Sequence, residues 1–385
     1  MLFPELTSPI SHLQLPSLSA PVAGCDTTVV IPVRNEAASL DRTLQALAGQ
    51  WDHDRRPLSD FEILLLANNC RDDSARVIRR FGERHPELTV HLLEVELPTG
   101  QAHVGRARKL LMDLACARLL AVGRPAGIIA STDADSRVAP DWLARIRAAM
   151  ACGADAVAGW VDTSGVERQA LDEPLSRHLR EDHAHHWLAS AAASRLDPAP
   201  HDPWPRHRNR SGASLAVSAA AYRACGGLPA LPTGEDRGLY RALLRSGARV
   251  RHCPRVRVST SLRWRGRARG GMADWLARHR LNSRPRRVVA VAPWLRHWRL
   301  RGRLRACWSA RGSGWRRTGC STAGGSTSPS VLSRIDWRHC WRPCRWIPRS
   351  ATPSASYRTG TGAGAQAVED AGVRSHRSRR KNSSR

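Results

Sequence analysis

The sequence lacks any apolar run of about 18 residues, the length that a membrane-spanning helix needs. It also lacks the basic start of a signal peptide, because "MLFPELTSPISHLQLP" opens the chain with prolines and no lysine or arginine. We therefore predict a cytoplasmic protein with no membrane span in this chain. Peripheral contact with the inner face of the membrane stays open as an alternative.

Paired cysteines are also missing. The chain has ten cysteines but no Cys-x-x-Cys pair, and the spaced pair Cys340 and Cys344 lies in an irregular C-terminal stretch. This pattern predicts neither a zinc site nor a disulfide framework.

Acidic residues are scarce in one part of the chain. Residues 283–385 hold 23 basic and 3 acidic residues, a net charge of +20 out of +28, and the first 282 residues carry only +8. The same 103 residues contain 7 of the 14 tryptophans and only 12 leucine, isoleucine and valine residues. So few aliphatic side chains bury too little apolar surface to offset the entropy of ordering, which predicts a disordered basic tail.

The tail composition has two interpretations. The tail is rich in Arg, Trp, Gly, Ser, Pro and Cys and shows no helical or strand periodicity of its apolar residues. A G+C-rich gene that is translated out of frame yields this composition, so we predict a frameshift near residues 280–290. An Arg/Trp-rich tail that stacks the bases of RNA is the alternative. A frameshifted product could be inactive, if the lost end normally completes the acceptor side.

Strands and helices alternate in the body of the chain. The predicted strands are residues 27–33, 61–67 and 88–95 and the runs "AGIIASTDAD" and "ADAVAGWVD". Helical patterns such as 37–50 and 100–122 separate them. Residues 178–196 indicate another helix, and the alternating residues 248–261 a two-sided hairpin. This order predicts an α/β domain with a mostly parallel sheet.

Polar clusters follow three of these strands. Asn35 and Glu36, Asn68 and Asn69, and Asp133 with Asp135 each come just after a strand. In parallel sheets, ligands bind at the carboxyl edge where such residues meet. An Asp-x-Asp could simply be a polar turn, but three clusters at one edge favour a binding site.

Four segments, in this order and spacing, resemble the family-two glycosyltransferases: "VVIPVRNEAASLDRTL", "NNCRDDSA", "STDADSRVAPDWL" and "GEDRGLYRAL". The resemblance covers residues 26–275. It implies a single glycosyltransferase A-type domain, a Rossmann-like nucleotide-diphospho-sugar transferase fold, and an inverting, hexosyltransferase-like activity that depends on a divalent metal. The expected organisation is an N-terminal extension (1–24), a transferase domain (25–282) and the tail (283–385). The domain would divide into a nucleotide-sugar-binding half (25–136) and an acceptor-side half (137–282).

The resemblance also implies a metal and donor site. Mg²⁺ or Mn²⁺ would bridge carboxylates and the donor diphosphate, with Asp135 as metal ligand and Asp133 at the metal or the ribose. Family members often carry a further metal-ligating histidine, but Ser259 stands at that place here. The residues expected to bind the nucleotide sugar are Pro32, Val33, Asn35, Glu36, Asn68, Arg106, Arg108 and Asp133. Glu36, Arg106 and Arg108 could equally be ordinary solvated helix charges.

On the acceptor side, Asp236 matches the general base of inverting members, and Glu235 would orient it or the acceptor. Arg208, Asn209, Arg210 and Gly212 lie where the family meets its acceptor, and the arginines suit an anionic one. A helix cap is the plain alternative for Glu235 and Asp236.

Three alternative functions are weighed against this interpretation. A retaining transferase of the same fold would use Asp236 differently. A nucleotidyltransferase is disfavoured, because no Gly-rich phosphate loop with a following lysine appears near the first strand. A basic nucleic-acid-binding protein would depend on the tail alone, so we expect no nucleic acid partner.

Overall fold

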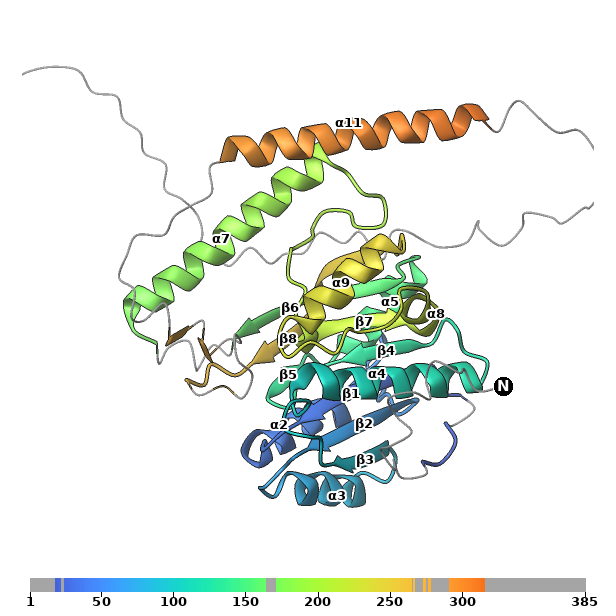
Figure 1. Cartoon of the computed structure of the whole chain (residues 1–385), viewed down its shortest axis with the longest axis vertical. Coiled ribbons are helices and arrows are strands. Elements are labelled where there is room, and N and C mark those ends of the chain that lie inside the picture. The colour runs from blue at the N-terminus through green and yellow to red at the C-terminus, as the bar shows by residue number, and fades with distance from the viewer. Residues whose placement is uncertain are drawn as a thin grey trace, which may run out of the picture. The chain divides into compact units, whose positions relative to one another are not determined.

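The computed structural model describes residues 18–21, 24–163, 171–264, 266, 273–274, 276–277 and 291–315. One eight-stranded sheet forms the centre of the domain, in the order β3-β2-β1-β4-β7-β6-β8-β5 (Figure 1). Its strands are β1 Thr27–Val33, β2 Phe61–Asn68, β3 Thr89–Val95, β4 Ile128–Ser131, β5 Ser136–Val138, β6 Ala156–Thr163, β7 Leu215–Ser218 and β8 Val250–Thr260.

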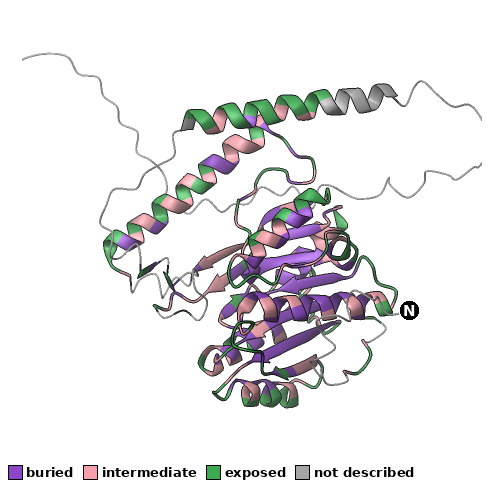
Figure 2. Cartoon of the chain, in the orientation of Figure 1, coloured by how far each residue is buried: buried purple, intermediate pink, exposed green. Residues whose placement is uncertain are grey.

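Helices cover both faces of the sheet. Side chains of β1 alternate between them: Val29, Ile31 and Val33 pack with α2, α3 and α5, and Val30 packs with α4, α8 and α9. Figure 2 shows the buried strands between helices whose outer surfaces are exposed. Strands covered on both faces are apolar almost throughout, which is why they appear in the sequence as continuous β-branched runs. The helices are α2 Ala37–Ala48, α3 Ser74–Arg84, α4 Val104–Ala121, α5 Trp142–Ala151, α7 Glu173–Leu196, α8 Ala219–Ala224, α9 Glu235–Arg245 and α11 Val291–Trp315, with a 3₁₀ turn at Gly212–Ser214.

The predicted mostly parallel α/β sheet is confirmed. Strands β3, β2, β1 and β4 are mutually parallel, and β7 is antiparallel to both β4 and β6. The ends of β1, β2 and β4 therefore meet at one edge, since Val33 pairs with Ala67 and Val30 with Ser131. That edge is where the polar clusters were expected.

A buried ion pair joins the C-terminal part of α4 to the start of β2. Arg118 Nη2 lies 2.6 Å from Glu62 Oε2, and Thr28 Oγ1 donates to Glu62 over 2.8 Å. Of the predicted N-terminal extension, residues 1–17, 22 and 23 lie outside the described residues, and the Ser19 carbonyl accepts from Arg118 Nη1 at 2.8 Å.

The hairpin predicted over 248–261 is wrong, because these residues form the single strand β8. It runs parallel to β6 and antiparallel to β5. Its register with β6 shifts between Gly159 and Trp160, which pair with Cys253 and Arg257. The intervening residues, Pro254 among them, form an irregularity that tolerates a residue without an N–H donor.

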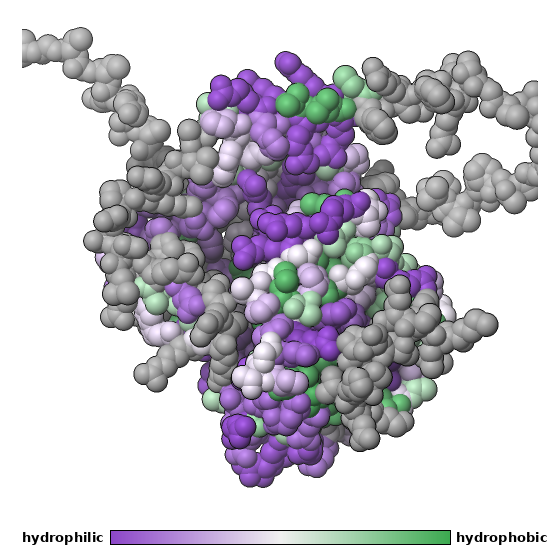
Figure 3. All heavy atoms as spheres, in the orientation of Figure 1, coloured by the Kyte–Doolittle hydropathy of each residue, from purple (hydrophilic) through white to green (hydrophobic). Residues whose placement is uncertain are grey.

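Helix α11 lies where the sequence predicts an irregular tail. Arg301 and Arg305 on α11 pair with the Asp197 carboxylate, at 3.1 and 2.8 Å, at the end of α7. Residues 316–385 lie outside the described residues, and so do the junction residues 278–290; the frameshift stays a prediction. Among the described helices, none is long and apolar enough to cross a membrane. In the view of Figure 3, hydrophobic residues appear in small groups among hydrophilic ones.

Candidate active site

A cleft of about 890 Å³ opens at the carboxyl edge of the sheet. It brings together most of the residues that the sequence singles out: Pro32, Val33, Glu36, Asn68, Arg108, Asp133, Asp135, Arg208, Asn209, Arg210, Gly212, Glu235 and Asp236. These residues come from both predicted halves of the domain. The cleft is therefore formed by segments up to about 240 positions apart in the chain.

The two aspartates lie on the short connection between β4 and β5. Asp133 Oδ1 accepts from Arg108 Nη2 at 2.6 Å, and Asp135 Oδ2 lies 2.9 Å from Arg263 Nη2. Burial and the neighbouring Asp133 raise the pKa of Asp135 to about 6, although the Arg263 charge opposes the shift. Both carboxylates of the Asp-x-Asp are thus held by guanidinium groups.

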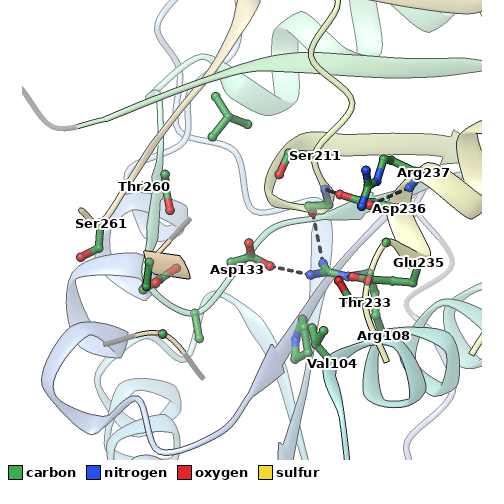
Figure 4. A pocket seen from close by; sticks show the side chains of 18 of the residues that line it. Val104, Arg108, Asp133, Ser211, Thr233, Glu235, Asp236, Arg237, Thr260 and Ser261 are labelled. Atoms are coloured by element: carbon green, nitrogen blue, oxygen red, sulfur yellow. Dashed lines mark hydrogen bonds and ion pairs between the residues drawn. The ribbon is translucent and has the colours of Figure 1, made fainter. Parts of the chain in front are cut away.

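Arg108 connects the two sides of the cleft (Figure 4). Its side chain is 3% exposed, and it donates to Asp133, to Ser131 Oγ, to the Gly212 carbonyl at 3.1 Å and to Glu235 at 3.3 Å. Four of its five N–H donors are occupied by the protein itself. Arg108 is therefore a positioning residue in this structure, and its predicted contact with a nucleotide stays a prediction.

Gly212 allows this approach because it has no side chain. A Cβ atom there would lie 2.9 Å from Arg108 Cζ. The Gly212 N–H donates to Asp236 Oδ2 at 3.2 Å, so one residue touches both the arginine and the candidate base. The close approach explains why the chain needs glycine at this position.

Glu235 and Asp236 begin helix α9. The preceding Gly234 is in the left-handed region (φ 75°), which turns the chain into the helix. Burial raises the pKa of Glu235, and Arg108 partly offsets the shift. Asp236 is half-buried, and its second oxygen accepts from the Arg237 N–H at 2.6 Å. The helix start favours both carboxylates, yet their partners across the cleft make them more than a helix cap.

The end of β1 supplies a third carboxylate. Glu36 is buried, and Arg263 donates to its two oxygens at 2.7 Å each. Arg263 therefore bridges Glu36 and Asp135, a contact that the sequence analysis did not predict. Nothing local to Arg263 signals it, because it lies in an arginine-rich stretch 227 positions from Glu36.

Two predicted nucleotide-site residues do not line the cleft. Asn35, with φ 53°, accepts from the Arg71 N–H at 2.7 Å and so shapes the turn after β1. Arg106 points away, because residues two apart on a helix lie about 200° apart around its axis.

Asn68 lines the cleft, and its buried Oδ1 has no hydrogen-bond partner. His252, the nearest histidine in sequence to the family position at Ser259, is bonded through Nδ1 to Asp202 at 2.9 Å.

The acceptor-side loop is held by aromatic rings. The Arg208 Cζ lies 5.3 Å from the Trp294 ring centroid, and the Arg210 Cζ 5.2 Å from that of Tyr240. The Asn209 side chain donates to the Val161 carbonyl at 3.3 Å and accepts from the Ser211 N–H at 3.1 Å. Trp160 also lines the cleft and was missed, because it lies within the apolar run of β6.

Residues 28–185 match Glycosyl transferase family 2. No curated protein matches the chain significantly in sequence.

Three solved structures are similar to parts of this chain. The mannosyltransferase PcManGT from Pyrobaculum calidifontis, in complex with GDP-Man and Mn²⁺, is 21% identical with a TM-score of 0.44 over 66% of this chain and 61% of that one. TarS 1–349 from S. aureus, in complex with UDP-GlcNAc, is 14% identical with a TM-score of 0.42 over 63% and 60%. Glucosyl-3-phosphoglycerate synthase from Mycobacterium tuberculosis, in complex with Mn²⁺, UDP and phosphoglyceric acid, is 17% identical with a TM-score of 0.37 over 67% and 78%.

This chain spans less than two thirds of the length of the first two. The family match covers β1 to the middle of α7, including the Asp-x-Asp loop. The match to glycosyl transferase family 2 therefore covers the first part of a single α/β domain.

Proposed function

We propose that this chain transfers a sugar, a hexose in our interpretation, from a nucleoside diphosphate sugar to an acceptor hydroxyl, with inversion at the anomeric carbon. The observation that carries the proposal is the joining of Asp133 and Asp236 across one cleft. Arg108 contacts Asp133 and the Gly212 carbonyl, and the Gly212 N–H contacts Asp236. A donor-side carboxylate and a candidate base are thus held on a common frame.

The donor set fits a divalent cation that is completed by its substrate. Asp133 and Asp135 offer two carboxylates in one cleft, and hard cations often take one or two carboxylates together with phosphate oxygens. Among the described residues, no group of three or more His, Cys, Asp and Glu could hold a metal alone. When bound, Mg²⁺ or Mn²⁺ would neutralise the charge on the diphosphate leaving group. Asp135 would have to exchange the Arg263 guanidinium for the cation.

The protein's own groups have the following roles in this proposal. Asp236 accepts the proton of the acceptor hydroxyl as its oxygen attacks the anomeric carbon. The N–H groups of Gly212 and Arg237 hold the Asp236 carboxylate in place. Arg108 keeps Asp133 directed into the cleft, and Asn68 offers an unpartnered oxygen at the β2 end to an N–H of the nucleotide base.

Ligand-dependent thermal stability of the full chain tests the donor site. UDP, GDP and dTDP are added singly, each with and without Mn²⁺ or Mg²⁺. At 100-fold over Kd a ligand contributes about 2.7 kcal/mol, so we expect Tm to rise by about 5 °C or more. The rise should require the cation and vanish in Asp135→Asn. Asp141→Asn is the matched control, since Asp141 pairs with Arg145 at 2.9 Å outside the cleft. Equal shifts in both variants would refute the assignment.

The base has a separate test. We expect Asp236→Asn to lower the turnover of the selected donor by at least about 100-fold, the size typical of a lost general base, while the nucleotide Kd changes less than twofold. Activity is followed as release of the nucleoside diphosphate. Unchanged turnover would exclude Asp236 as the base.

A further inference from the structure

The guanidinium groups that line the cleft differ in whether a carboxylate neutralises them. On the donor side, Arg108 and Arg263 are neutralised by Asp133, Glu235, Glu36 and Asp135. On the acceptor side, Arg208 and Arg210 line the cleft and are exposed. Within the part of the chain that the structure describes, neither of them has an ion pair with a carboxylate. Arg34, which donates to the Ala102 carbonyl on the donor side, and Arg237 at the start of α9 also line the cleft without a carboxylate pair among the described residues, so Arg208 and Arg210 are distinguished by their position on the acceptor side.

Aromatic rings orient both unpaired groups. The Arg208 guanidinium packs against Trp294 and Trp298 of α11, with Cζ 5.3 and 5.8 Å from the ring centroids. The Arg210 guanidinium packs against Tyr240 of α9 at 5.2 Å. A ring under a guanidinium contributes cation–π attraction and restricts its rotation, while the N–H donors at its edge stay available. Such donors match the oxygens of a carboxylate or phosphate.

The acids of this region do not neutralise the two arginines. Asp236 binds the N–H groups of Gly212 and Arg237, and Asp182 lies 3.4 Å from His186 on the same face of α7. Tyr240 follows Asp236 by four residues on α9, which is one helical turn, or about 6 Å between Cβ atoms. Arg210, whose guanidinium packs on Tyr240, is therefore positioned within about one helical turn of the candidate base.

An apolar surface completes this part of the cleft. Trp160 lines it, and its ring is surrounded by those of His183, Trp187 and His207 at 5.3, 6.1 and 5.4 Å between centroids. An indole ring in a sugar-transferring cleft offers a surface for the carbon face of a sugar ring. The acceptor side thus presents cationic groups and an aromatic ring together.

From this arrangement we propose that the acceptor is anionic, an inference that rests on the proposed function. Arg208 and Arg210 bind a carboxylate or phosphate group of the acceptor and place its hydroxyl near Asp236. The aromatic residue Trp160 contacts the ring or carbon chain that carries the anion.

Three probes with a common ring test the proposal: glucose, glucuronate and glucose 6-phosphate. Calorimetric titration of the full chain is performed with the nucleoside diphosphate selected above and Mn²⁺, and again without them. We expect both anions to bind at least tenfold more tightly than glucose. Arg208→Gln/Arg210→Gln should abolish this preference and change the nucleotide Kd less than twofold. The double variant breaks no carboxylate pair and loses only the cation–π contacts of two exposed side chains, so its Tm should fall by no more than a few degrees.

The matched control is Arg241→Gln, an exposed arginine of the same helix α9 that does not line the cleft; it should keep the preference. Equal binding of glucose and the anions would overturn the proposal. So would a double variant that keeps the anion preference but loses nucleotide affinity, because the arginines would then belong to the donor diphosphate. Anion preference without nucleotide binding would refute the proposed donor and support the acceptor subsite.

Sedimentation with phosphatidylglycerol vesicles, against phosphatidylcholine vesicles, separates two sources of a phosphate. Capture that is lost in the double variant but kept in Arg241→Gln assigns the anion to a lipid headgroup. A chain that prefers glucose 6-phosphate and is not captured takes a soluble anion. Either result supports the anionic subsite.

Discussion

Arg108 offers the sharpest test of how the cleft is held together. Replacing it with methionine keeps most of the apolar stem but removes the guanidinium. Glu235, with a side chain 8% exposed, then loses its partner inside the protein, and Asp133, 33% exposed, loses a 2.6 Å contact. The Gly212 carbonyl and the Ser131 hydroxyl lose a donor as well.

The expected cost follows from these burials. Removing one member of a buried ion pair costs about 3–5 kcal/mol, because a charge stays buried without compensation. Glu235 should account for most of it, since Asp133 reaches solvent. If so, adding Glu235→Gln to Arg108→Met should recover at least about 1 kcal/mol, because the uncompensated charge is gone.

Urea unfolding of the single and double variants measures these free energies. Arg118→Met is the matched control: Arg118 is also buried against a glutamate, Glu62, but away from the cleft. Both single variants should lose similar stability, and only Arg108→Met should weaken nucleotide binding. A loss below about 1 kcal/mol in Arg108→Met, or no recovery in the double variant, would refute the role given to this arginine.

Three further predictions concern pH, packing and metal. Burial raises the pKa of Glu62, but its hydrogen-bond donors outweigh burial and lower the pKa to about 2. The stabilisation of the folded state by ionised Glu62 is therefore complete above the unfolded pKa of 4.5 and is lost as pH falls through about 2. Glu62→Gln should remove about 3 kcal/mol of this acid-dependent stability, and parallel urea-unfolding losses between pH 6 and pH 3 in both proteins would contradict it. Gly212→Ala should cost about 1–3 kcal/mol in the same assay, since its Cβ would meet Arg108 at 2.9 Å; an unchanged unfolding midpoint would show that the arginine simply moves. Arg263→Gln should tighten Mn²⁺ binding severalfold without nucleotide, as followed by electron paramagnetic resonance of free Mn²⁺, because it frees Asp135; weaker binding would mean that Arg263 assists the cation.

The order of elements was accessible from the sequence because it depends on local patterns. Short β-branched runs between amphipathic segments predict buried parallel strands, and β1, β2, β3 and β4 lie where those runs lie. The hairpin prediction failed because alternation within 248–261 reports a strand but not its partner. Both neighbours of β8, β6 and β5, are remote in sequence.

The candidate site divides in the same way. That Asp133, Asp135, Glu36 and Asn68 line one cleft could be predicted, since residues that follow parallel strands meet at the carboxyl edge. Of the two predicted arginines on α4, Arg108 lines the cleft and Arg106 does not. Which of them does so depends on which face of α4 packs on the sheet, and the local sequence does not fix that face. The contacts of Arg108 with Glu235 and of Arg263 with Glu36 span 127 and 227 positions. Such pairings leave no local signal, because only the packing of the whole sheet fixes which charges meet.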